Sequence, residues 1–497
     1  MSRKSNEARR PFFGCSIFLI VVILLLIAGT AYTAWLCYDF VNRSADTDIR
    51  QEQNIQLPTA VTTEPTTEAT TEPPPPEPEK VIATATIGTT GDVLMHMPVI
   101  DTGRQSDGSY DFESIFRYLE PYSSQVDFAA ANLETTLAGT DNGYPYHGYP
   151  NFNAPDAIVT AARDAGFDMF LTANNHRYDT GIVGCRRPLD VDREAGMETL
   201  GTMSTAEEPK YLVQDINGIK IGMLCYTYAY SVNAQGCPSL NGMPHISEPG
   251  LCNYFHKDNL EAFYDEVETY LGEMEQAGAE ATVMYIHWGV EYQTYANDEQ
   301  KTIAQRLCDL GIDVIIGGHP HVVQPVDLIQ STQDPDHKTV CLYSMGNAVS
   351  NQRQGNISYI NTAHTEDGVW FTVTFEKYSD GTVYLAGTEL IPTWVNMHTG
   401  NGKKEYNILP LDPETQDDWK SLYNMNDTNM NNALKSYDRT LAIVGGGMEK
   451  VQSYLQQKKL DRDAYYLDLV TNPDKYDENG VLIVTPTQAP TEETVSE

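Results

Sequence analysis

Positive charge is scarce in this sequence of 497 residues, which has 32 Lys and Arg residues against 69 Asp and Glu residues and a formal net charge of −37. Nonspecific binding of nucleic acid depends on neutralising phosphates with Lys and Arg, so this balance excludes it. It leaves open an anionic ligand held in a local site, above all by a metal ion. About 41% of the residues are hydrophobic, which is enough for a large core.

Cysteine is sparse as well, with eight residues and no CxxC pair, which argues against a zinc ribbon. Cys237 and Cys252 bracket a loop rich in Gly and Pro, and they form either a disulfide or two free thiols. Cys225, Cys308 and Cys341 stand in apolar runs, which predicts buried thiols.

Charged residues are absent from residue 11 to residue 38, and Ile17–Ile27 is almost purely aliphatic. The run exceeds the ~20 residues that cross a bilayer core. Basic residues precede it and Asp39 follows it, so the positive-inside rule places the N-terminus in the cytoplasm. The sequence predicts a single-pass protein of the cell membrane with an extracellular main domain. A signal peptide cleaved near Gly29–Ala31 is the alternative.

Residues 58–80 contain Thr, Glu and Pro but no aromatic residue, so they predict an extended, self-repelling spacer. The end of the chain has a similar composition. The predicted order is a cytoplasmic basic tail at 1–10, a transmembrane anchor at 11–38, a disordered linker at 39–80, the main domain at 81–400, a helical C-terminal extension at 401–480 and a disordered tail at 481–497.

Short apolar runs alternate with helical patterns in the main domain. The predicted strands are Val81–Thr89, Val126–Ala131, Phe167–Leu171, Lys220–Tyr226, Thr282–Ile286, Val314–Ile316 and Thr339–Tyr343. The predicted helices are Phe112–Leu119, Pro155–Ala165, Asn259–Ala277 and Glu299–Leu310. This alternation is typical of an α/β domain. Turn signals at Asn217-Gly218 and around Ser379–Gly381 predict two hairpins that add antiparallel strands.

Polar residues that can bind metal follow these strands. They are Asp92, Glu134, Asn175, His176, His287, His319 and His321. Taken singly, each has an ordinary explanation as a buried histidine, a turn residue or a helix cap. Together they offer imidazole, carboxylate and amide donors but no thiolate, a set that suits one or two divalent ions such as Mn, Fe or Zn. Two ions bridged by a carboxylate would polarise a substrate oxygen and activate water.

Six motifs occur in one order along the chain: GDVLMH, NLETTL, NNHRYDTG, HWGVEY, GGHPHVVQPVD and YSMGN. In this combination, from about Thr84 to Pro392, the sequence resembles the bacterial capsule-synthesis (CapA-like) family, which looks like a branch of the calcineurin-like metallophosphatases. The resemblance implies a four-layer αββα sandwich of metallophosphatase type, with a dimetal site at its top edge. One transmembrane helix would precede the sandwich and a small helical appendage would follow it.

The resemblance also implies roles for single residues. The implied metal ligands are Asp92, Glu134 as the bridging carboxylate, Asn175, His287, His319 and His321. His176 would act as the catalytic acid or base, with Asp179 orienting it. The implied rim of the substrate site is Trp288, Glu291 and Tyr292.

Two departures from the metallophosphatase pattern concern the metal site. Asp92 is followed by Val93 and Leu94, so the Asp-x-His opening is missing and His96 falls two residues late. A Glu stands where the bridging Asp is usual. Both departures match the capsule branch, and they leave the number of ions at one or two. His96 as a replacement ligand is a further alternative.

Two classes of function fit these observations. The first is a metal-dependent hydrolase or transferase that acts on an envelope polymer, at a γ-glutamyl amide or a phosphoester. The second is a non-catalytic component that binds the polymer beside capsule synthase subunits in the membrane. In both, the expected partner is an anionic polymer such as poly-γ-glutamate. Because most of the surface would repel it, we expect contact at the metal site.

Overall fold

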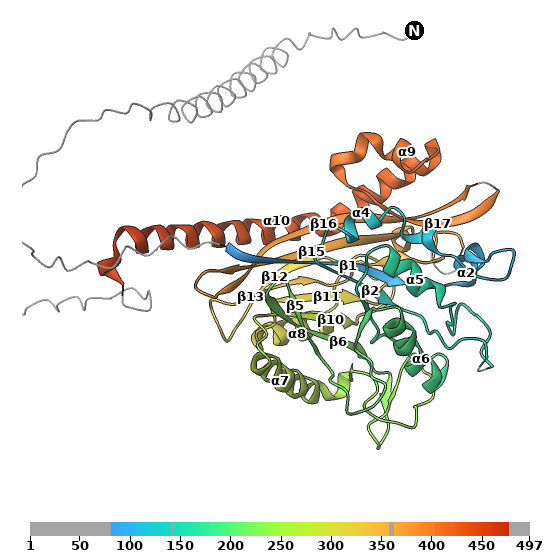
Figure 1. The fold of residues 1–497 in the computed structure, drawn as a ribbon, viewed down its shortest axis with the longest axis horizontal. Coiled ribbons are helices and arrows are strands. Elements are labelled where there is room, and N and C mark those ends of the chain that lie inside the picture. Colours follow the sequence, from blue (N-terminus) through green and yellow to red (C-terminus); the bar gives the residue numbers. More distant parts are fainter. Residues whose placement is uncertain (1–80, 142, 357–361, 401, 477–497) are drawn as a thin grey trace, which may run out of the picture. The chain divides into compact units, whose positions relative to one another are not determined.

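The structure, a computed structural model shown in Figure 1, describes residues 81–476 except residues 142, 357–361 and 401. The expected cytoplasmic tail, transmembrane anchor, linker and disordered C-terminal tail lie outside the described residues. Within the described part, no helix combines the length and the apolar character that crossing a membrane requires. The assignments for the terminal segments therefore stay predictions.

The larger of two main sheets is built around β1 (Val81–Val93). Its strands follow the order β17-β16-β15-β1-β2-β3-β4, and β14 pairs with the end of β1. Strands β1 to β4 run parallel, whereas β15 to β17 are antiparallel. The bounds of the other strands are β2 (Phe128–Leu133), β3 (Met169–Leu171), β4 (Glu198–Leu200), β14 (Asn347–Val349), β15 (Asp367–Tyr378), β16 (Val383–Gly400) and β17 (Lys403–Pro410).

The second sheet has the order β12-β13-β11-β10-β6-β5, with β9 beside β6. Strands β6, β10, β11 and β13 run parallel. The bounds are β5 (Leu212–Ile216), β6 (Ile219–Tyr228), β9 (Tyr254–Phe255), β10 (Ala281–His287), β11 (Val314–Gly318), β12 (Val326–Gln330) and β13 (Lys338–Leu342). A short hairpin, β7 (Ser231–Val232) and β8 (Pro238–Ser239), stands apart. All seven predicted strands and both predicted hairpins are confirmed.

Figure 1 shows the sheets layered with helices outside them, and three apolar clusters lie between these layers. Side chains of β1 and β6, such as Ile87 and Met223, share the central cluster between the sheets. A second cluster joins the larger sheet to helices on its outer face, and a third joins the smaller sheet to α7 and α8. The helices are α2 (Met97–Gly103), α3 (Glu113–Phe116), α4 (Glu120–Ser123), α5 (Ala157–Asp164), α6 (Gly181–Glu194), α7 (Leu260–Gln276) and α8 (Asp298–Asp309). The expected α/β sandwich is therefore confirmed.

The C-terminal helix α10 (Asp427–Thr471) is part of this sandwich rather than an appendage. It contacts β16 of one sheet and β12 of the other. Val444, Met448, Val451 and Leu455 belong to the central cluster, and their spacing places them on one helical face. The helix closes one side of the core because both sheets leave apolar side chains uncovered there.

The predicted domain boundary at residue 400 is wrong, since it falls inside a hairpin of the larger sheet. There β16 pairs with β17 up to Pro410, and the helical part begins only with the 3-10 helix η3 (Pro413–Asp418), which α9 (Trp419–Leu422) follows. Polar residues in KKEYNILP hid this strand, because an edge strand needs only one apolar face.

The cysteines of the described region are all buried and free. Cys237 and Cys252 form no disulfide, which decides between the two alternatives for this pair. Cys225, Cys308 and Cys341 are buried thiols, as predicted, and burial raises the pKa of Cys225 to about 12.

A glycine triplet in α10 provides a test of its packing. A Cβ at Gly447 would lie 1.9 Å from the Val326 carbonyl oxygen in β12, whereas one at Gly446 would meet nothing within 4 Å. We expect Gly447→Ala to lower the free energy of unfolding by about 2 kcal/mol through overpacking. The control Gly446→Ala should raise it by about 1 kcal/mol through helix propensity. Urea denaturation measures both, and equal effects would contradict this packing.

Candidate metal centre

The larger sheet brings four of the predicted site residues together at the carboxyl ends of its parallel strands. Asp92 is the next-to-last residue of β1, Glu134 directly follows β2, and Asn175 and His176 follow β3. The smaller sheet adds three histidines from the other side. His287 ends β10, and His319 and His321 follow β11. Two sheets with parallel strands thus present their carboxyl ends to one place, where ligand groups gather in α/β folds.

A close backbone contact positions Asp92. Its N–H donates to the Gly346 carbonyl oxygen at 3.0 Å, and a Cβ at Gly91 would lie 2.0 Å from that oxygen. Only glycine permits this approach, and the register of β1 against its neighbours shifts at this point. The Asp92 carboxylate then accepts hydrogen bonds from Asn132 Nδ2 at 2.7 Å and from His321 Nδ1 at 3.1 Å.

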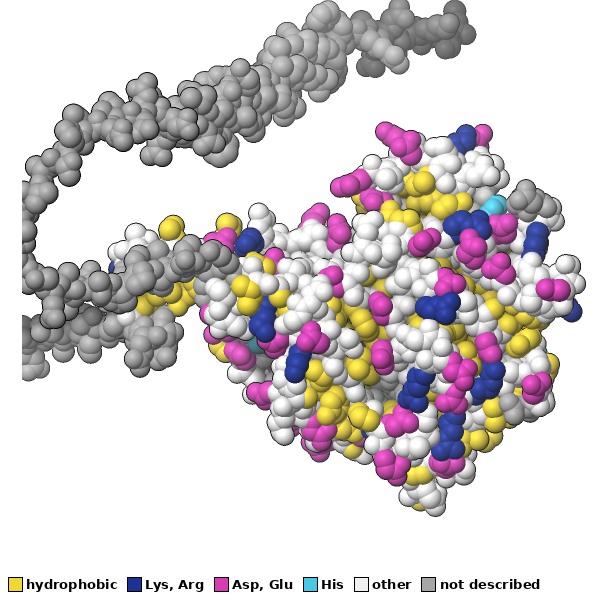
Figure 2. All heavy atoms as spheres, in the orientation of Figure 1, with side chains coloured by type: hydrophobic (Ala, Val, Ile, Leu, Met, Phe, Trp, Pro, Cys, Tyr) yellow, Lys and Arg dark blue, Asp and Glu magenta, His cyan; other side chains and the backbone are white. Residues whose placement is uncertain are grey.

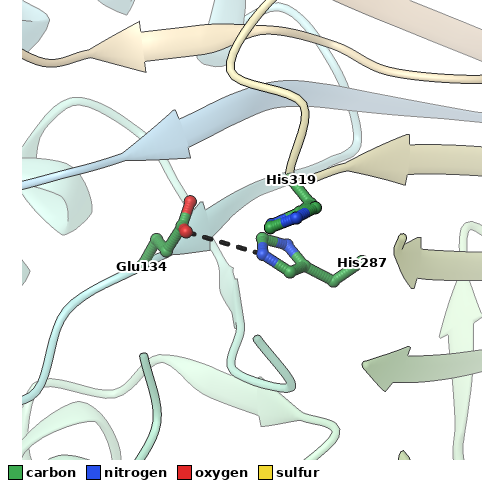
Figure 3. Close-up of side chains that lie close together, drawn as sticks. All are labelled: Glu134, His287 and His319. Atoms are coloured by element: carbon green, nitrogen blue, oxygen red, sulfur yellow. Dashed lines mark ion pairs between the residues drawn. The ribbon is translucent and has the colours of Figure 1, made fainter. Parts of the chain in front are cut away.

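Glu134 lies at the centre of the site and is fully buried. Its Oε1 is 3.5 Å from His287 Nε2, 3.8 Å from His321 Nε2 and 3.9 Å from His176 Nε2. Figure 3 shows its carboxylate pointing toward His287, with the ring of His319 beside that histidine. Neither carboxylate oxygen has a hydrogen-bond partner, although buried carboxylates are normally satisfied.

The Gly-Gly-His-Pro-His turn holds two imidazoles in an unusual backbone conformation. His319 has φ 95° and His321 has φ 56°, a left-handed region that costs roughly 1–3 kcal/mol for a residue with a side chain. Gly318 lies close to the site, because a Cβ there would meet Asp92 Oδ1 at 3.1 Å. The strain places both rings against the site, and His319 Nδ1 is buried there without a partner.

Asp179 fixes the orientation of the His176 ring. Its Nδ1 lies 2.7 Å from Asp179 Oδ2, and the same oxygen accepts the Phe152 N–H at 2.7 Å. The ring also packs edge-on against Phe152, with 4.7 Å between centroids. Asp179 therefore fixes the ring and directs Nε2 toward Glu134, as the sequence resemblance implies.

Burial sets the protonation of the central groups. It raises the pKa of Glu134 well above the usual value, and the nearby Asp92 carboxylate adds to this. Burial lowers the pKa of His287 to about 3 and that of His319 well below its usual range. Burial opposes ionisation of Asp92 too, but its contacts with His321 outweigh this and lower its pKa. Neutral imidazoles with free lone pairs are the form that binds metal.

The donors fit divalent ions. Two groups can each surround an ion, Glu134–His287–His319 and Asp92–Glu134–His321, with ligand atoms within 4.8 Å of one another. Four donors at ~2.1 Å from one ion lie about 3.4 Å apart in a tetrahedron, close to the 3.5 Å between Glu134 and His287. Asn175 Oδ1 adds an amide oxygen 2.8 Å from His287 Nε2. The carboxylate shared by both groups is Glu134, the predicted bridging residue.

A cavity of about 330 Å³ opens beside these donors. It is lined by His176 and His321 from the site and by Glu291 and Tyr292 from the predicted rim. Trp288 does not line it, so its assignment to the rim is wrong. Trp288 is 1% exposed and its Nε1 donates to the Tyr343 carbonyl oxygen at 2.8 Å. Next to His287, it points to the opposite face of the sheet.

His96 lines the same cavity rather than the metal centre. It belongs to neither donor group, and its Nδ1 accepts the Asn351 N–H at 3.3 Å. Burial lowers its pKa to about 4, so the ring faces the cavity in its neutral form. The geometry therefore does not support His96 as a replacement ligand.

Two asparagines of the site were not among the predicted residues. Asn132 Nδ2 donates to Asp92 and lies 3.5 Å from His287 Nδ1. Asn347 Oδ1 lies 3.2 Å from His321 Nδ1. Both stand inside motifs of the resemblance, NLETTL and YSMGN, which is the signal that would have found them.

The comparisons with known proteins agree with the motifs. Residues 86–352, more than half of the chain, match the family described as "Bacterial capsule synthesis protein PGA_cap". The chain is 26% identical over 265 residues to "Capsule biosynthesis protein CapA" of Bacillus anthracis, across 53% of this chain and 59% of the relative. It is also 26% identical over 266 residues to "PGA biosynthesis protein CapA" of Bacillus subtilis, across 53% and 62%. The matches thus span about three-fifths of these relatives.

Two solved structures are similar at a low level. A putative 5′-nucleotidase from Staphylococcus aureus has a TM-score of 0.38 and 15% identity, and the match covers 69% of this chain and 58% of that one. The sulfate thiohydrolase SoxB from Thermus thermophilus has a TM-score of 0.34 and 12% identity, with coverage of 72% and 60%. These values carry no conclusion about activity. The family match covers residues 86–352, more than half of the chain, and shows that this chain belongs to the bacterial capsule synthesis protein PGA_cap family.

Proposed function

We propose that the chain is a membrane-anchored, metal-dependent hydrolase or transferase that acts on an anionic capsule polymer, poly-γ-glutamate, outside the cell. One observation carries the proposal. Glu134 is a buried carboxylate without a hydrogen-bond partner, and it belongs to both groups of donors that could hold an ion, one with His287 and His319 and the other with Asp92 and His321. Core packing does not explain such a group, since an unpaired buried charge destabilises the fold by several kcal/mol.

The residues fit divalent ions of the Mn, Fe or Zn type. Glu134, His287 and His319, with Asn175, would hold one ion, and Asp92, Glu134 and His321 would hold the other. When bound, such ions polarise a substrate oxygen and lower the pKa of water.

The chain itself contributes a proton-transfer group and a binding cavity. Asp179 holds Nδ1 of His176, so that Nε2 of His176 faces Glu134 and the cavity. From this atom a proton can pass to the leaving nitrogen of a γ-glutamyl amide or the leaving oxygen of a phosphoester. Tyr292 lines the cavity as well, and it would orient the chain of the substrate.

Other features support the location and the partners of the proposal. The uncharged segment at 11–38 supports a single-pass anchor with the N-terminus in the cytoplasm. The family supports a capsule polymer as the substrate and synthase subunits as neighbours in the membrane. A non-catalytic polymer-binding component is the alternative, and the experiment below separates the two.

The test is to incubate purified full-length protein with γ-linked glutamate polymer and, separately, with a chromogenic phosphate diester. Release of shorter glutamate chains or of the chromogenic alcohol is expected from protein loaded with Mn or Zn. Chelation should abolish the release and added metal should restore it. The non-catalytic alternative would be established by two results together. The purified, metal-loaded protein would cleave neither substrate, and the same protein would still support capsule formation in cells.

Metal content gives a more direct prediction. We expect about two divalent ions per chain in wild-type protein, measured by elemental analysis after growth in metal-replete medium. His319→Ala and His321→Ala should each lose about one ion, because each histidine belongs to a single donor group. His96→Ala is the matched control, since His96 is buried nearby but belongs to neither group. A metal-free wild type would refute the metal site.

A further inference from the structure

A second cleft lies far from the metal centre, between the C-terminal half of α10 and the beginning of β16, and has a volume of about 480 Å³. At this end of the sandwich Tyr378 pairs with Val81, the first residue of β1, whereas Asp92 stands at the other end of that strand. At ~3.3 Å per residue, the two ends are roughly 35 Å apart. The cleft is therefore separate from the cavity beside His176.

Cations in this cleft rest on tyrosine rings. The Arg462 guanidinium lies 4.0 Å from the ring centroid of Tyr378 and 4.4 Å from that of Tyr384. The ammonium groups of Lys338 and Lys458 lie 4.6 Å and 5.8 Å from the ring centroid of Tyr454. Such contacts hold a cation in place but leave its charge available.

These three cations have no carboxylate partner within ion-pair distance among the described residues, and Arg462 Nε is buried without a hydrogen-bond partner. Many basic side chains elsewhere pair with acids, as Arg186 does with Glu248. On the face shown in Figure 2, Lys and Arg lie among Asp and Glu. The cleft is lined by four Lys and Arg residues against three Asp residues, and one of the acids, Asp313, is buried and accepts hydrogen bonds from Thr282.

We propose that this cleft binds carboxylates of an extended polyglutamate chain, as a holding site remote from the metal centre. The inference rests on the proposed function for the identity of the polymer. Lys458 and Arg462 are one helical turn apart, about 5–6 Å between Cβ atoms, and Lys338 stands on β13. A row of separated cations suits charges that repeat along a polymer, and a guanidinium edge can bind a carboxylate through two parallel hydrogen bonds.

The rest of the molecule favours this position. The chain has a net charge of −37, so a polyanion is repelled from most of its surface. No Lys or Arg is among the described residues that line the cavity beside His176. A polymer bound only there would depend wholly on metal ions, whereas the cleft on α10 provides attraction without them.

The experiment measures binding of a fluorescent γ-linked glutamate decamer to full-length protein by anisotropy, with and without a chelator. Lys458→Gln combined with Arg462→Gln should weaken binding by about tenfold, since the loss of two charge contacts at this partly exposed site corresponds to ~1.4 kcal/mol. Lys338→Gln should weaken binding of the decamer several-fold. Because Lys338 lies on β13 and not on α10, this variant still tests the proposal if the double variant fails to fold. Arg306→Gln is the control, because Arg306 on α8 also rests on a tyrosine ring outside the cleft, 5.7 Å from the ring centroid of Tyr264 on α7.

The outcomes separate this proposal from the metal site. Binding that survives chelation and Glu134→Gln, but falls with the cleft variants, supports the cleft whether or not the protein is an enzyme. Loss of all binding on chelation would place the polymer at the metal centre and overturn the cleft. Equal weakening by Arg306→Gln, or tight binding of polyphosphate with none of the decamer, would overturn it as well.

Discussion

Replacing Glu134 by Gln is expected to abolish tight binding of metal at both donor groups while stabilising the metal-free protein. Glu134 is the one residue that the two groups share, so its loss affects both ions. Removing a residue that only supports a ligand lowers the affinity for metal by about 10–100-fold. Because Glu134 is itself a ligand, we expect its replacement to lower the affinity by more than about a hundredfold. Isothermal titration with Mn or Zn measures this.

The gain in stability follows from the pKa of Glu134, which burial raises well above its value in the unfolded chain. A group with a raised pKa in the folded state contributes stability below its unfolded pKa of ~4.3, and that contribution is lost as the pH rises through the folded pKa. Gln does not ionise. The metal-free variant should therefore exceed the metal-free wild type in free energy of unfolding, increasingly so toward pH 8.

Bound metal reverses the order of the two free energies of unfolding, so that the wild type becomes more stable than the variant. Saturating metal at a thousandfold excess over Kd should stabilise the wild type by about 4 kcal/mol and the variant by much less. Glu291→Gln is the matched control, because this exposed carboxylate lines the cavity but belongs to neither group. Denaturation with chelator and with metal measures both effects. A Glu134→Gln protein that binds two ions with wild-type affinity would show that Glu134 is no shared ligand.

The second large effect is expected from His176→Ala, which should lower kcat by about 10²–10⁴, the usual contribution of a general acid or base. Its metal content should stay unchanged, because His176 belongs to neither donor group. Asp179→Asn should lower kcat by about 10–100-fold, since it disturbs the orientation of the ring but leaves the ring present. Activity on the cleaved substrate and elemental analysis are measured together.

His245→Ala is the matched control for this prediction, because His245 is exposed, hydrogen-bonds to Ser231 and belongs to neither donor group. It should retain wild-type activity. A folded His176→Ala protein with undiminished kcat would remove the acid–base role. The non-catalytic alternative would hold if the wild type cleaves no substrate and cells that carry His176→Ala still form capsule.

Sequence reasoning predicted the elements that carry the site because buried parallel strands are short apolar runs and their ends are polar. It failed for residues and elements whose role depends on their position in the folded structure. Trp288 stands next to His287, yet alternation along a strand sends it into the core. Asn132 and Asn347 were missed because an amide that supports a ligand resembles any turn or strand asparagine until its partner is known. The C-terminal helix was misplaced because its apolar stripe, Val444 to Leu455, is diluted by polar residues on its other faces.

The position of α10 also determines when the site is completed. The central cluster takes side chains from α10 as far as Leu455, and β1 pairs with β15, so the strand that bears Asp92 gains its antiparallel neighbour only after residue 367 has been made. In a chain synthesised from its N-terminus, the sheet and the core around the donor groups are therefore completed only when nearly all of it has emerged. On the proposed export of the main domain, the ions available to the donor groups would therefore be those of the compartment in which folding ends.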